Sequence, residues 1–205
     1  MRAIRRLIAK FLGQILHLAA YGSIALAVGL ASAWYMVEAG SRLTLDRDGP
    51  WKRWTQAGAP SADPYTRAHF ARAGWLPLSG DAAAYLTTSR DSAGEPLYSD
   101  CVYTVSGSKP AARRWTLSAF DLNGALLDSG PGQSVASSDT ALPGPGGTLA
   151  ITISQSPSPG NWLNVTGSTR MQLLLTLYGI RQNTAVKSST AKAAEPLRID
   201  KESCR

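Results

Sequence analysis

Cys101-Val102-Tyr103-Thr104-Val105 is a run in which Cys101, Tyr103 and Val105 alternate with Val102 and Thr104. Similar runs with a period of two lie at residues 115–119, 148–154 and 171–177. Alternation of this kind indicates β-strands that turn one face towards a core. Turn-forming sequences separate the runs, at residues 91–94, 123–124, 143–147 and 156–160. About seven short strands at this spacing predict a mainly β fold, an antiparallel β-sandwich or jelly roll.

A short helix is predicted ahead of the sandwich, from Pro64 to Ala73. Asp63 suits the N-cap, Pro64 suits the first helical position, and Gly74 can close the last turn. The fold class is therefore a β-sandwich preceded by one short helix.

An apolar segment near the N-terminus, residues 15–37, contains no Asp, Glu, Lys or Arg over 23 residues. About 20 helical residues cross the hydrocarbon core of a bilayer, so this segment is long enough to be a transmembrane anchor. The alternative is a signal peptide cleaved after Ala33, because Ala31-Ser32-Ala33 matches a small-residue cleavage site. An anchor and a cleaved signal peptide both imply that the domain that follows is exported.

The basic residues of the chain are concentrated at its ends. The formal net charge is +7, but residues 38–180 hold eleven basic and eleven acidic residues. A protein that binds nucleic acid needs its positive charge on the folded domain, so nucleic-acid binding is not expected. The four basic residues within 1–14 instead favour an N-terminus in the cytoplasm. We expect a single-pass protein of the bacterial inner membrane with its domain in the periplasm.

These observations divide the chain into five parts. They are a cytoplasmic basic segment (1–14), the transmembrane anchor or uncleaved signal (15–37), a linker (38–62), the β-sandwich domain (63–180) and a disordered tail (181–205). The tail is assigned as disordered because it is polar, poor in aromatic residues and without a period.

Several short sequences together resemble a family of bacterial domains of unknown function, number 1214 (DUF1214), and in particular its short membrane-anchored branch. They are DPY (63–65), DSAGEPL (91–97), CVY (101–103), RWTL (114–117), FD (120–121), PGNWL (159–163) and LTLY (175–178). The resemblance covers roughly residues 48–180. It implies a β-sandwich in the envelope of a Gram-negative bacterium, with a companion domain of unknown function, number 1254, as a candidate partner. It implies no reaction.

Side chains that could support catalysis are few. His69 is the only histidine beyond the apolar segment, and a lone histidine has no visible partner to orient it. Zinc needs three or four ligands at close spacing, so no metal site or cofactor is expected. A carboxylate pair such as Glu95 and Asp121 is the remaining option, but each lies in or beside a predicted turn. Aspartates in turns usually bind their own backbone.

The candidate binding residues are Trp115, Trp162, Glu95 and Asp121. The two tryptophans can form an aromatic platform, although burial in the core is the commoner fate of such residues. Cys101 and Cys204 can form a disulfide in an oxidising compartment. Because Cys101 is predicted to point into the core and Cys204 lies at the end of the predicted tail, two free thiols are expected.

The sequence therefore favours a non-catalytic binding module in the cell envelope. Its expected contacts are the lipid bilayer, through residues 15–37, and a protein with the companion 1254 domain. The alternative is an enzyme that uses a carboxylate pair on an envelope glycan or a small periplasmic molecule.

Overall fold

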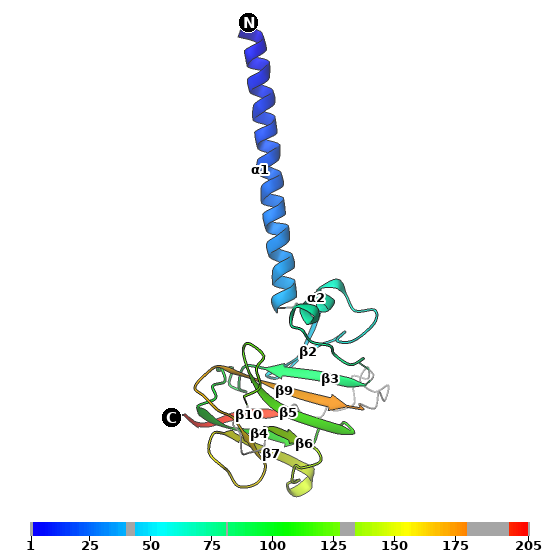
Figure 1. The fold of residues 1–205 in the computed structure, drawn as a ribbon, viewed down its shortest axis with the longest axis vertical. Helices are drawn as coiled ribbons and strands as arrows, with labels where there is room; N and C mark the ends of the chain where they lie inside the picture. The colour runs from blue at the N-terminus through cyan, green and yellow to red at the C-terminus, as the bar shows by residue number, and fades with distance from the viewer. Residues whose placement is uncertain (1, 40–43, 81, 128–133, 180–196, 205) are drawn as a thin grey trace.

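The computed structural model describes residues 2–39, 44–80, 82–127, 134–179 and 197–204. Helix α1 (Arg2–Ala39) is a single long helix that projects away from the β domain (Figure 1). Its segment Lys10–Glu38 is a candidate membrane span, and none of its apolar window is buried in the protein. Within Lys10–Glu38 the leucines are exposed, which fits the membrane anchor predicted at 15–37.

Ten strands among the described residues form two sheets (Figure 1). In spatial order, the first sheet contains β1 (Leu45–Asp48), β2 (Trp51–Trp54), β3 (Ala83–Thr88), β9 (Met171–Tyr178), β5 (Arg114–Asp121) and β6 (Val135–Ser137). The second contains β10 (Arg198–Cys204), β4 (Cys101–Ser108), β7 (Thr148–Ser154) and β8 (Trp162–Asn164). The β7–β8 pair is parallel and the other pairs are antiparallel. The predicted mainly β, sandwich-like fold is confirmed.

One hydrophobic core joins the two sheets. Tyr103 and Val105 of β4 are fully buried, as is Ile151 of β7. Leu117 of β5 and Leu173 of β9 meet them from the other sheet in the same cluster. The intervening side chains of β4 are only partly buried. This pattern is the alternation seen in the sequence, because successive side chains of a strand point to opposite faces.

Helix α2 (Pro64–Arg72) begins where the sequence predicted. Asp63 Oδ1 accepts hydrogen bonds from the backbone N–H groups of Tyr65 and Thr66, at 2.9 and 3.0 Å. Gly74 follows the helix with a φ of 65°, a conformation that glycine adopts without strain. A short 3₁₀ helix, η1 (Pro145–Gly147), precedes β7.

Two predicted boundaries differ from the structure. The expected linker at 38–62 contains β1 and β2, which pair with each other and extend the first sheet through β3. The expected tail at 181–205 contains β10, which pairs with β4, while residues 181–196 lie outside the described part. Strands β1 and β2 have four residues each, and β10 buries little besides Ile199. Trp51 of β2 and Ile199 of β10 do reach the core, but one buried residue in a strand gives no apolar alternation.

Candidate functional site

The contact between α2 and the end of α1 places the domain beside the anchor. His69 Nδ1 donates a hydrogen bond to the carbonyl oxygen of Val37, at 2.8 Å. Arg72 forms an ion pair with Glu38, with 2.6 Å between nitrogen and oxygen. The His69 ring also stacks on Trp54, with the ring centroids 4.2 Å apart. His69 therefore satisfies a carbonyl at the C-terminal end of α1, where helices leave such groups unpaired.

The predicted carboxylates organise turns and loops. Asp121 Oδ1 accepts the backbone N–H groups of Asn123 and Ala125, at 2.9 and 2.8 Å. Asp91 Oδ1 does the same for Ala93 and Glu95, at 3.0 and 2.8 Å.

Asp100, Glu95 and Asp128 are further candidate carboxylates. Asp100 Oδ2 accepts the hydroxyl of Ser168, at 3.0 Å. Glu95 is exposed, and Asp128 lies outside the described residues. Neither of the two cavities described below holds two carboxylates. The structure thus does not place Glu95 and Asp121 together in either cavity.

Trp115 and Trp162 lie in different sheets. Trp115, on β5, is 1% exposed, and no hydrogen-bond partner for its Nε1 is present in the described part of the chain. Trp162, on β8, is half-buried, and its Nε1 donates to the carbonyl oxygen and the hydroxyl of Ser154, both at 3.1 Å. The two rings therefore do not form one platform.

A cavity of about 330 Å³ lies beside Trp115. Its other lining residues come from β5, β9, β6 and the residues that follow β6: Arg114, Thr116, Ser137, Ser138, Asp139 and Tyr178. Arg114 and Asp139 form an ion pair at 3.6 Å, and both are exposed. Trp115 thus lines this cavity and carries a buried indole N–H without a partner in the described part of the chain.

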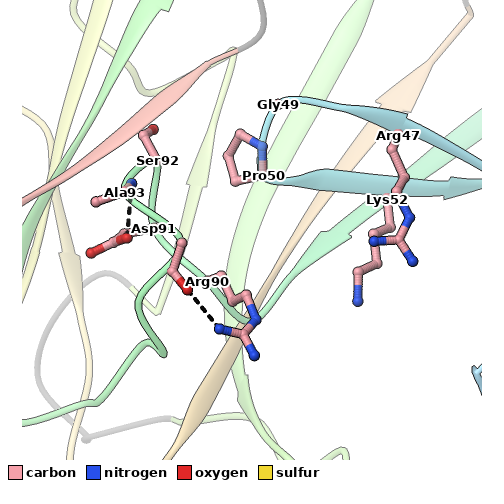
Figure 2. A pocket seen from close by; sticks show the side chains of 9 residues that line it. Arg47, Gly49, Pro50, Lys52, Arg90, Asp91, Ser92 and Ala93 are labelled. Atoms are coloured by element: carbon pink, nitrogen blue, oxygen red, sulfur yellow. Dashed lines mark hydrogen bonds between the residues drawn. The ribbon is translucent and has the colours of Figure 1, made fainter.

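A second cavity, of about 270 Å³, lies between the β1–β2 hairpin and the loop after β3 (Figure 2). Arg47, Lys52 and Arg90 line it. Burial lowers the pKa of Lys52 below its usual range, and the positive charges of Arg47 and Arg90 lower it further. Sequence analysis missed this cluster; the only signal was the placement of Arg47 and Lys52 on either side of the Asp48-Gly49-Pro50 turn.

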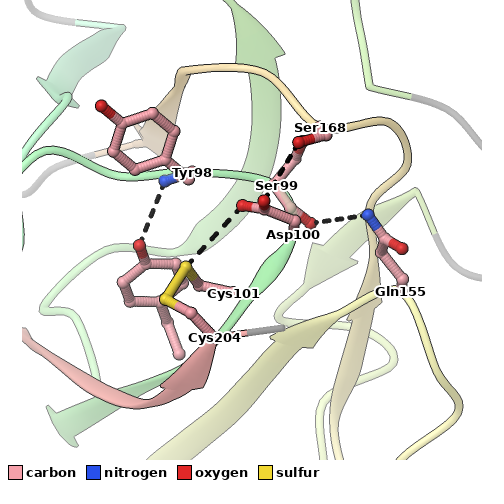
Figure 3. The surroundings of a disulfide bond; sticks show 8 residues. Tyr98, Ser99, Asp100, Cys101, Gln155, Ser168 and Cys204 are labelled. Carbon is pink, nitrogen blue, oxygen red and sulfur yellow. Dashed lines mark hydrogen bonds between the residues drawn. A yellow bond between two sulfur atoms is a disulfide. The ribbon is translucent and has the colours of Figure 1, made fainter.

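Cys101 and Cys204 form a disulfide (Figure 3). The expectation of two free thiols is wrong, because the predicted tail contains β10, which pairs with β4. Cys204 is the last residue of β10, and its Cα pairs with the Cα of Cys101 at the start of β4. The two Cα atoms are 4.0 Å apart. The bond fixes the end of β10 to the second sheet.

No group of three or more His, Cys, Asp or Glu side chains suited to a metal ion occurs within the described ranges. The functional candidates are therefore the Trp115 cavity and the basic cavity.

The region from β3 to just beyond β9 matches a known family. Residues 82–182 match the family model described as "Protein of unknown function (DUF1214)". Residues 82–182 form a DUF1214 domain. The family resemblance drawn from the sequence is confirmed, and the apolar α1 fits the membrane-anchored branch. The β1–β2 hairpin and β10 lie outside the matched region, although they complete the two sheets around the DUF1214 domain.

One solved structure shares the fold, and a second gives a weaker match. A crystal structure of the VPA0106 protein from Vibrio parahaemolyticus is similar with a TM-score of 0.54 and 17% identity, covering 69% of this chain and 36% of that chain. An uncharacterized protein from Burkholderia cenocepacia gives a TM-score of 0.44 and 16% identity, covering 63% of this chain and 32% of that one. This chain thus spans about a third of the length of both proteins. No curated protein sequence matches it significantly.

Proposed function

We propose that this protein is a non-catalytic binding module, tethered by α1 to the periplasmic face of a bacterial inner membrane. Its proposed partner is a protein that carries the companion domain of unknown function, number 1254. The DUF1214 domain presents the binding surface, and the anchor confines that surface to the membrane.

Two features support export of the domain. The basic residues of 1–14 precede the apolar span, which favours an N-terminus in the cytoplasm. The Cys101–Cys204 disulfide requires an oxidising compartment, and the periplasm is one.

The observation that carries the binding role is the Trp115 cavity. Binding pockets combine apolar walls with a few polar groups that await a ligand. A buried indole N–H without a partner is costly in the free protein, and an oxygen of a bound partner would satisfy it.

Co-purification tests the proposal. The full chain, extracted in a mild detergent, should retain a co-expressed 1254-domain protein from the same genome. Trp115→Phe removes the indole N–H and keeps an aromatic ring, so it should weaken the complex roughly three- to tenfold, the value of one hydrogen bond.

Trp162→Phe is the matched control. It also removes an indole N–H, but this N–H already has partners in Ser154, and Trp162 does not line the Trp115 cavity. Its complex should be unchanged. Recovery of the wild-type chain alone, or equal weakening by both variants, would contradict the proposed binding site.

A further inference from the structure

The β1–β2 hairpin carries two acidic residues and one basic residue on one face, Asp46, Asp48 and Arg53, and only positive charge on the other. On one face, Asp46 and Arg53 lie opposite each other and form an ion pair at 2.9 Å. At the next position, on the other face, Arg47 lies directly opposite Lys52. Like charges at directly opposed positions destabilise a strand pair. The hairpin therefore retains an unfavourable pair next to a favourable one.

Arg90 brings a third positive charge to this face. It follows β3, the strand that pairs with β2, and its Nη1 donates to the carbonyl oxygen of Gly94 at 2.6 Å. Figure 2 shows the ends of Arg47, Lys52 and Arg90 on the same side of the hairpin. The ion pairs within the described ranges involve other arginines: Arg53, Arg72, Arg114 and Arg198.

The one carboxylate that lines this cavity does not neutralise the cluster. Asp91 is 4% exposed, and its Oδ1 accepts two backbone N–H groups of its own turn. In Figure 2 its carboxylate lies on the opposite side of the loop from Lys52. Three cationic groups thus line a space of about 270 Å³ whose single lining carboxylate, Asp91, is hydrogen-bonded within its own turn.

We infer that Arg47, Lys52 and Arg90 form a binding site for a phosphoryl group. Arginine forks match the oxygens of phosphate, and lysine adds a point charge. A phosphoryl group has several oxygens and up to two negative charges, so it suits three cations better than a single carboxylate does. A cavity of this size accommodates a phosphoryl group but not a large ligand. This site lies apart from Trp115 and does not depend on the proposed protein partner.

The state of Lys52 agrees with this assignment. Its pKa is lowered by partial burial first and then by its two cationic neighbours. A bound phosphoryl group would offset all three effects, because an opposite charge within a few ångströms favours the charged form of lysine.

Calorimetric titration of inorganic phosphate into the full chain in a non-ionic detergent tests the site. We expect saturable binding that weakens as sodium chloride is raised, because exposed charges are screened. The double variant R47Q/K52Q should reduce the affinity at least tenfold. R53Q removes one charge from the other face of the hairpin and should change the affinity less than twofold. Circular dichroism and thermal melting confirm that each variant is folded.

A second titration identifies the source of the phosphoryl group. The full chain is placed in nanodiscs of phosphatidylcholine alone or with phosphatidylglycerol. If the natural ligand is a lipid headgroup, inorganic phosphate should bind the wild type more weakly in discs that contain phosphatidylglycerol, because the lipid competes for the site. R47Q/K52Q should show no such competition. If the ligand is soluble, phosphate binds equally in both discs. Absence of binding, or equal losses in R47Q/K52Q and R53Q, would overturn the site and leave the cations as protection of the β1 edge.

Discussion

At the scale of single residues, Asp63 stabilises the first turn of α2 by accepting two backbone N–H groups. Asp63→Ala removes this cap and should lower the free energy of unfolding by about 1 kcal/mol. Asp63→Ser keeps a capping oxygen and should lose only a small part of that. Urea unfolding of the full chain in detergent measures both variants. Equal losses in the two would show that the cap is not the source of the effect.

The same residue predicts a dependence on pH. Burial alone would raise the pKa of Asp63, but hydrogen bonds from Thr66 and Tyr65 outweigh it and lower the pKa below its ordinary value of 3.8. The folded pKa is therefore below the unfolded one. The resulting stability is complete above pH 3.8 and is lost as pH falls through the folded pKa. Asp63→Asn cannot titrate, so the stability difference between the wild type and this variant should shrink on acidification.

Lys52 is expected to be unfavourable for stability. Lys52→Glu turns the opposed Arg47 pair from repulsive to attractive and should raise the free energy of unfolding by about 0.5–1 kcal/mol at low salt. Arg53→Glu makes the reverse change opposite Asp46 and should lower it. Urea unfolding at two salt concentrations tests both. A loss of stability in Lys52→Glu would mean that packing of the lysine stem outweighs the repulsion.

At the scale of elements, the disulfide holds β10 in the second sheet. Replacing both cysteines by serine should lower the free energy of unfolding by about 4 kcal/mol, since the bond closes a loop of about 100 residues. Hydrogen exchange should then speed up in β10 more than in β7. Adding a reductant to the serine variant is the control and should change nothing. Unchanged exchange in β10 would show that backbone pairing alone retains the strand.

The interior strands could be predicted from the sequence, whereas the peripheral strands could not. Strands β4, β5, β7 and β9 each bury one face in the shared core, so their alternation appears in the sequence. Strands β1 and β2 are too short to show a period, and β10 exposes most of its side chains. The capped α2 was predictable because its signals are local: a cap, a proline and a glycine.

At the scale of the whole molecule, the candidate sites depend on register and on the packing of distant segments. The burial of Trp115 follows from strand alternation, but its cavity also needs Tyr178 and the residues after β6. The basic cavity could not be predicted from composition, because residues 38–180 have a net charge of zero. Only the pairing of Arg47 with Lys52 and the position of Arg90 show that three positive charges meet.

The topology of the whole chain gives a further prediction. The protein should remain in the membrane pellet after alkaline carbonate extraction, and deletion of residues 15–37 should release it. A C-terminal alkaline phosphatase fusion should be active, because that enzyme folds only outside the cytoplasm. A fusion to residues 1–14 alone is the control and should be inactive. A mature protein that begins at Trp34 would instead support the cleaved signal peptide.

The pairing of Cys204 with Cys101 also sets the timing of maturation. The two residues are separated by 103 positions, which a ribosome translates in about 5–20 s. During that interval the β4 edge has open backbone groups that β10 will later occupy, and such an edge can recruit strands from other chains. In the proposed periplasmic location, the unpaired edge of β4 and the free thiol of Cys101 would therefore need protection from other strands and other thiols until β10 is translated.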